Sequence, residues 1–253
     1  MALTINADNP QTHYNLANLL LQKEKLDEAI VHYRETLRVQ PEYVKARLQL
    51  AELLWRQGDL DRAVDHYQQV LQIQPNHALA HRLMGEARVQ QGRFDQAVTH
   101  FRLALQQGDN QAKTQYGLGI ALTMTGPADE AIAAVRQAIH LAPNAAEPLN
   151  LLARILSTAT DPKQRKPKEA VKLAERAAQL TDHGKPKILD TLAAAYAAAG
   201  QFDRAVETAQ MAVDLALAAN DQALAAKIDK RKHLYQQETP YSPRPHESNS
   251  SGE

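Results

Sequence analysis

The sequence lacks cysteine and is poor in aromatic residues, which make up 5% of its 253 positions. The absence of cysteine excludes disulfide bonds, thiol catalysis and cysteine-ligated zinc. Lysine and arginine together number 29, and so do aspartate and glutamate, so the formal net charge is zero. Because a general electrostatic grip on nucleic acid or anionic lipid needs a large basic excess, we expect no nucleic-acid partner.

Long apolar runs are also missing. No stretch of the sequence approaches the roughly 18 apolar residues that a membrane-spanning helix needs. The first ten residues lack a basic start followed by an apolar core, so we do not expect them to form a signal peptide. We therefore expect a soluble fragment, cytoplasmic or periplasmic, with no direct insertion into a membrane.

The sequence does contain an internal repeat. The alanines Ala29, Ala63, Ala97 and Ala131 are 34 residues apart, and Ala170 and Ala205 follow after 39 and 35. Each period indicates two helices, the second of which ends before a proline such as Pro75. Small residues such as Gly85 in the first helix are predicted to pack against large ones such as Phe101 in the second. Aspartates at equivalent positions are predicted to cap the second helices, namely Asp27, Asp61, Asp95, Asp129 and Asp203.

These residues resemble the tetratricopeptide repeat family, in a bacterial-type array. The resemblance implies an all-α fold, a right-handed α-solenoid of about six two-helix repeats plus a C-terminal capping helix. The repeats are assigned to 10–43, 44–77, 78–111, 112–145, 146–185 with a loop insertion, and 186–219. Residues 220–238 are predicted to form the capping helix and residues 239–253 a disordered tail. Residues 1–9 look like the remnant of a preceding repeat, so we expect a piece of a longer protein.

Motifs for catalysis, cofactor binding or metal binding are not found in the sequence. Tyr116-Gly117-Leu118-Gly119 begins like a dinucleotide fingerprint but lacks its third glycine. His32, His66 and His100 recur every 34 residues. Neighbouring helices pack about 8–10 Å apart, too far for these histidines to share one zinc ion. We expect them at solvated or half-buried convex positions, and predict no enzyme activity, no cofactor and no metal.

The resemblance also implies a binding surface, because the first helix of each repeat lines the concave groove in this family. The predicted groove residues are Tyr14, Asn15, Asn18, Lys45, Gln49, Glu52, Trp55, Arg82, Glu86, Tyr116 and Arg154. Trp55 is the first candidate for a binding hot spot, with packing between repeats as the alternative. The predicted function is a non-catalytic scaffold for protein–protein interaction, which holds an extended or helical peptide segment in the groove.

Two alternative interpretations stay open. In the first, the chain is the arm of a larger enzyme, such as a membrane glycosyltransferase-like protein, and positions its protein substrate or partner. The C-terminal repeats support this interpretation, because they look like the ends of multidomain proteins of this family. In the second, the chain self-associates through its uncapped N-terminal end.

Overall fold

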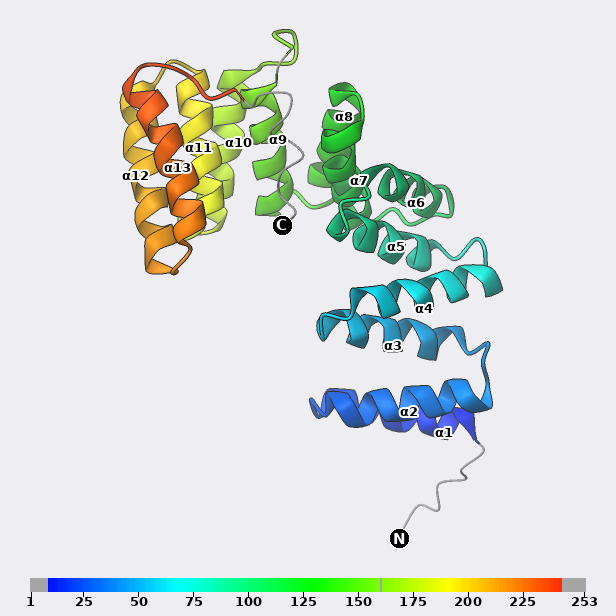
Figure 1. The fold of residues 1–253 in the computed structure, drawn as a ribbon. Coiled ribbons are helices and arrows are strands. Elements are labelled where there is room, and N and C mark those ends of the chain that lie inside the picture. The colour runs from blue at the N-terminus through cyan, green and yellow to red at the C-terminus, as the bar shows by residue number, and fades with distance from the viewer. Residues whose placement is uncertain (1–8, 160, 243–253) are drawn as a thin grey trace. The chain divides into compact units, whose positions relative to one another are not determined.

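A computed structural model describes residues 9–159 and 161–242, which contain thirteen α-helices and no strand (Figure 1). The chain divides into two compact units, Met1–Asp109 and Asn110–Glu253. Unit 1 contains α1 (Pro10–Gln22), α2 (Leu26–Val39), α3 (Val44–Arg56), α4 (Leu60–Ile73), α5 (Ala78–Gln90) and α6 (Phe94–Gln106). Unit 2 contains α7 (Ala112–Thr125), α8 (Ala128–Leu141), α9 (Ala146–Thr158), α10 (Pro167–Leu180), α11 (Pro186–Ala198), α12 (Phe202–Ala218) and α13 (Gln222–Gln236).

The helices pack in antiparallel pairs of consecutive elements, which confirms the predicted all-α repeat architecture. Each unit holds three such pairs, and we call the first member of a pair helix A and the second helix B. The last helix, α13, packs against α12 and buries Ile228 and Tyr235 completely. It is the predicted capping helix, since it covers an apolar face that would otherwise end the array.

The division into two units was not foreseen, because the sequence analysis treated the six repeats as one array. The boundary follows Asp109, in the loop after α6. Two other assignments fall largely outside the described residues. They are the remnant of a preceding repeat at 1–9, of which only Asn9 is described, and the disordered tail at 239–253, of which residues 239–242 are described.

Close approach within a helix pair depends on small residues in helix A. A Cβ atom placed on Gly85 would lie 2.9 Å from two ring carbons of Phe101, which is itself completely buried. In the same way, Gly119 on α7 faces the side chain of Val135 on α8, within the first helix pair of unit 2. The predicted packing of small residues against large ones is therefore present in both units.

The periodic aspartates do not cap helix B, contrary to the prediction. In the second repeat the N-cap residue is Asp59, whose Oδ1 accepts a hydrogen bond from the Arg62 backbone N–H, and Asp61 lies inside the first turn. There its carboxylate accepts a hydrogen bond of 3.0 Å from Gln91 at the end of the next helix A. Asp27 accepts the equivalent bond from Gln57, also at 3.0 Å. Asp27 and Asp61 therefore connect successive repeats.

Candidate functional site

The outward face of helix A in unit 1 carries an exposed stripe that repeats on α1, α3 and α5. Its residues recur at spacings of four, three and four along each helix, which places them on one face. We call this set the helix-A stripe: Gln11, Asn15, Asn18 and Gln22 on α1, Lys45, Gln49, Glu52 and Arg56 on α3, and Leu79, Leu83, Glu86 and Gln90 on α5. All twelve are exposed or half-buried.

On α1 the predicted residues are partly engaged in the fold. Tyr14 is half-buried, with its ring centroid 5.9 Å from that of Tyr33 and 5.1 Å from that of Tyr43. The hydroxyl of Tyr33 donates a 2.6 Å hydrogen bond to Asn18 Oδ1. Burial raises the pKa of Tyr33 to about 12, so this hydroxyl remains a donor at neutral pH. Asn18 is therefore held in place through its Oδ1, while Asn15 is exposed.

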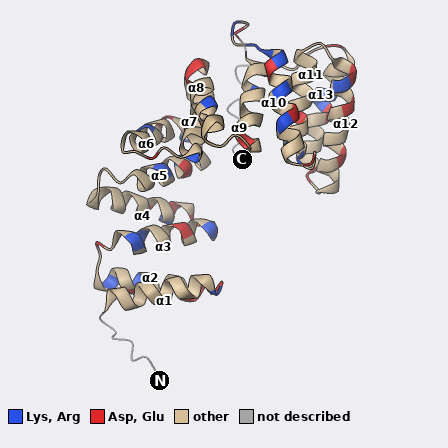
Figure 2. Cartoon of the chain, turned by 180° about the vertical axis from the view of Figure 1, so that it is seen from behind, with Lys and Arg blue, Asp and Glu red and all other residues tan. Residues whose placement is uncertain are grey.

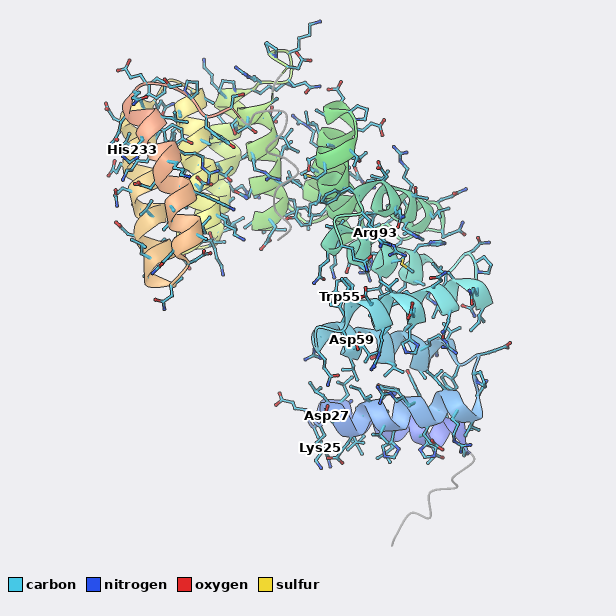
Figure 3. All side chains as sticks on the ribbon, viewed as in Figure 1. Lys25, Asp27, Trp55, Asp59, Arg93 and His233 are labelled. Carbon is cyan, nitrogen blue, oxygen red and sulfur yellow. The ribbon has the colours of Figure 1, made fainter. Side chains whose placement is uncertain are left out.

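On α3 the predicted groove residues have fewer contacts within the fold than those on α1, and two of them are exposed to solvent. Lys45 and Glu52 are exposed, and neither forms an ion pair within the described residues. Gln49 and Trp55 are half-buried. Trp55 lies near the C-terminal end of α3 (Figure 3), and its ring contacts that of Tyr67 edge-on with centroids 6.4 Å apart. Trp55 thus takes part in packing and also contributes to the surface.

Arg82 differs from the other predicted groove residues because its guanidinium forms ion pairs within unit 1. Its Nε lies 3.1 Å from Asp109 Oδ2, and its Nη1 lies 2.7 Å from Glu86 Oε1. The side chains of Arg82 and Asp109 are 10% and 4% exposed. The sequence analysis counted Arg82 only as a groove residue and assigned no role to Asp109. The two residues are 27 positions apart and form a buried ion pair.

Unit 2 has its own charged and aromatic residues on helix A. Tyr116 on α7 is half-buried, and Arg154 on α9 is exposed. Burial raises the pKa of Tyr116, and the charge of Glu147 adds to this effect. Asp190 on α11 forms a 2.6 Å ion pair with Arg231 on α13, and burial raises the pKa of Asp190 against the opposing effect of that arginine. The sequence analysis did not identify this pair.

The three periodic histidines are half-buried, as expected, but their rings face helix A. His32 Nδ1 lies 3.0 Å from His13 Nδ1, and His100 Nδ1 lies 3.1 Å from His81 Nδ1. His66 lies near the guanidinium of Arg47, which lowers its pKa in addition to the effect of burial. Across the described residues, no group of three or more histidine, aspartate or glutamate side chains is arranged to hold a metal ion.

Charges of both signs are interspersed over the helices (Figure 2). No helix in the described part of the chain is long and apolar enough to cross a membrane. The available chemistry on the helix-A stripe is hydrogen bonding by carboxamides, single charges of either sign and apolar contact with half-buried aromatic and leucine side chains. These are the components of a surface that binds protein segments.

Comparisons with solved structures show the same fold in other proteins. YrrB, described as a tetratricopeptide repeat protein with an unusual peptide-binding site, is 21% identical over 78% of this chain and 97% of its own, with a TM-score of 0.61. MamA from Desulfovibrio magneticus RS-1 is 20% identical over 69% of this chain and 96% of its own, with a TM-score of 0.59. PilF from Pseudomonas aeruginosa is 19% identical over 90% and 92%, with a TM-score of 0.58.

Among curated proteins, none matches the chain significantly. The family model described as "Tetratricopeptide repeat" matches residues 14–78 and 82–146, which together are just over half of the chain. A second model with the same description matches residues 189–211. These matches include helix pairs of both units. The chain belongs to the tetratricopeptide repeat family.

Proposed function

We propose that unit 1 is a non-catalytic binding module that holds an extended segment of a partner protein along the helix-A stripe. The observation that carries this proposal is the number of carboxamides in the stripe. Half of its twelve residues are asparagine or glutamine: Gln11, Asn15, Asn18, Gln22, Gln49 and Gln90. A carboxamide both donates and accepts hydrogen bonds. It can therefore pair with the free N–H and C=O groups of an extended backbone, which a helical segment would already have satisfied internally.

Aromatic and apolar side chains at the same surface supply anchoring contacts. Trp55 and Tyr14 are half-buried, so their rings are held by the fold while part of each stays in contact with solvent. Leu79 is 38% exposed at the start of α5. Rigid aromatic side chains lose little conformational entropy on binding, and Trp and Tyr are enriched among hot spots. Lys45 and Glu52 then select the charges of the partner segment.

The comparisons add support of a general kind. Tetratricopeptide repeat proteins are typically interaction scaffolds, and YrrB has the same fold and a peptide-binding site. Shared fold does not identify the partner, so the proposal depends on the residues of the helix-A stripe.

The proposal is tested with peptides selected from a random displayed library against the full chain. Binding of each selected peptide is measured by fluorescence anisotropy for the wild type and for Gln49→Ala, Trp55→Ala and Lys45→Ala. We expect Trp55→Ala and Gln49→Ala to weaken binding by about 1–3 kcal/mol, roughly five- to 150-fold, because hot-spot truncations have this size. Circular dichroism must first show that each variant keeps its helix content.

The matched control is Gln68→Ala on α4, because Gln68 is exposed on helix B. His66 is unsuitable as a control on helix B, because it is half-buried near Arg47. Gln68→Ala should change the affinity less than twofold. If the selected peptides lose affinity in Gln68→Ala and keep it in all three helix-A variants, the binding surface lies elsewhere and the proposal is wrong.

A further inference from the structure

Unit 1 contains a layer of basic side chains between helix A and helix B, at positions that follow the 34-residue period. On helix A these positions hold His13, Arg47 and His81, and on helix B they hold His32, His66 and His100. Two of the three pairs are direct imidazole–imidazole contacts, with Nδ1···Nδ1 distances of 3.0 and 3.1 Å. In the third pair, His66 lies near the guanidinium of Arg47. The proposed binding function uses none of these side chains.

The pair His81–His100 admits one arrangement of protons when both rings are neutral. His81 Nε2 lies 2.8 Å from the carbonyl oxygen of Pro75, which can only accept, so this nitrogen carries the hydrogen. Neutral His81 therefore has a lone pair on Nδ1, and His100 must donate its Nδ1–H to it. A proton added to His100 enters a partly buried site beside His81 and Arg88. A proton added to His81 Nδ1 would point two hydrogens at each other across 3.1 Å.

The other two positions also disfavour added protons. At the first, His32 faces His13 across the helix pair, and burial and His13 lower its pKa more than Glu28 and Glu35 raise it. At the second, burial, Arg47 and Arg34 lower the pKa of His66, and only Asp65 opposes them. Arg47 is itself buried, with its guanidinium donating to the carbonyl oxygen of Pro41 and to Gln69. It remains a cation at every relevant pH.

We propose that this layer makes unit 1 acid-labile, so that helix A and helix B of its repeats separate at a mildly acidic pH at which unit 2 remains folded. The equivalent positions of unit 2 hold Gln115 with Ala134, Leu149 with Leu173, and Leu189 with Thr208, none of which titrates. The described histidines of unit 2, His140, His183 and His233, are exposed. Among the described residues, buried and half-buried histidines are therefore confined to unit 1. The raised pKa of Asp190 in unit 2 has the opposite effect, because it favours the folded state as the pH falls.

The direction of the effect follows from proton linkage. Burial, His81 and Arg88 lower the pKa of His100 to about 4 in the folded protein, whereas an unfolded chain has about 6.5. The unfolded state therefore binds more protons between these two values. Stability from this residue is complete above pH 6.5 and is lost as the pH falls towards 4. At pH 5 the full shift corresponds to about a thirtyfold larger unfolding constant. We expect about tenfold, since the ring is only partly shielded from solvent.

Trp55 allows unit 1 to be measured separately, because it is the only tryptophan of the chain and lies on α3. Urea unfolding of the full chain is followed by Trp55 fluorescence and by far-ultraviolet circular dichroism at pH 7.5 and pH 5.0. Ordinary carboxylates titrate below this range and contribute little. We expect the unfolding constant reported by Trp55 to rise at least tenfold from pH 7.5 to pH 5.0. Circular dichroism should show a second transition, that of unit 2, which barely moves.

The variant His100→Gln keeps a donor to His81 Nδ1 and removes the titration, so the pH effect at Trp55 should shrink by about tenfold. The variant His32→Gln, at a more exposed site, provides a second test should His100→Gln fail to fold, with a smaller reduction. The control His140→Gln changes an exposed histidine of unit 2 and should keep the wild-type pH dependence. An unfolding constant at Trp55 that is equal at the two pH values overturns the proposal, as does a wild-type pH effect in both unit 1 variants.

Discussion

Replacing Arg82 with alanine should destabilise unit 1 substantially, because it removes the cation from a buried ion pair. Arg82 contacts Asp109 at 3.1 Å and Glu86 at 2.7 Å, and the Asp109 side chain is only 4% exposed. Removing one partner of a buried pair costs roughly 3–5 kcal/mol, since the remaining charge stays shielded from water. Asp109 follows the last helix of unit 1, where local opening can restore some hydration. We therefore expect a loss of about 2–3 kcal/mol in the free energy of unfolding.

The assay is urea unfolding at pH 7.5 followed by Trp55 fluorescence. With a urea dependence of about 1–3 kcal/mol per molar, the midpoint should fall by roughly 0.7–3 M. Arg56→Ala is the matched control, because Arg56 is an arginine on another helix A of unit 1 and is exposed to solvent. It should change stability by less than about 0.5 kcal/mol.

A double-mutant cycle separates the ion pair from other effects of the truncation. The variants Arg82→Ala and Asp109→Ala should each destabilise unit 1, and the double variant should be more stable than their sum predicts by about 1–3 kcal/mol. Additive losses, or an Arg82→Ala midpoint equal to that of the wild type, would refute this account. If Arg82→Ala destabilises unit 1 as expected, this variant cannot be used to test contacts with a partner, because a loss of binding would then reflect the loss of stability.

Further predictions concern packing, the connection between repeats and metal dependence. Gly85→Ala should destabilise unit 1 by about 1–3 kcal/mol, because the new methyl group meets the buried ring of Phe101. Thermal unfolding followed by Trp55 fluorescence measures this loss, and an unchanged midpoint would show that the ring moves away. Asp61→Ala removes the exposed hydrogen bond from Gln91 and should cost about 0.5–1.5 kcal/mol in urea unfolding, so a larger loss would indicate a second role for Asp61. Addition of EDTA should leave the midpoint of thermal unfolding unchanged, because the described residues offer no set of three ligands, and a fall of several degrees would show that a metal ion contributes to stability.

Much of the local structure could be predicted from the sequence because it depends on residues close together in the chain. The 34-residue period placed the helix pairs and the contact of Gly85 with Phe101, since a helical period fixes which side chains share a face. The aspartate positions show how far such a pattern can be interpreted. Asp61 recurs for a physical reason, yet that reason is a hydrogen bond to Gln91 in the next repeat and not a cap on its own helix.

The candidate site was only partly predictable, because tertiary contacts decide which side chains of helix A stay free. The period places Lys45, Gln49 and Arg82 on the first helices of their repeats and does not distinguish them. In the fold Lys45 is exposed, whereas Arg82 pairs with Asp109, which lies 27 residues away in the loop after α6.

The imidazole pairs show the same division between sequence and structure. Their members are 19 residues apart, and the period alone does not reveal whether a ring faces solvent or the neighbouring helix. The sequence by itself therefore determined the repeat, the helices and their pairing, all of which follow from local periodicity. Only the tertiary structure decided the division into two units, the buried charges and the acid-sensitive layer, because each depends on which distant side chains the packing brings together.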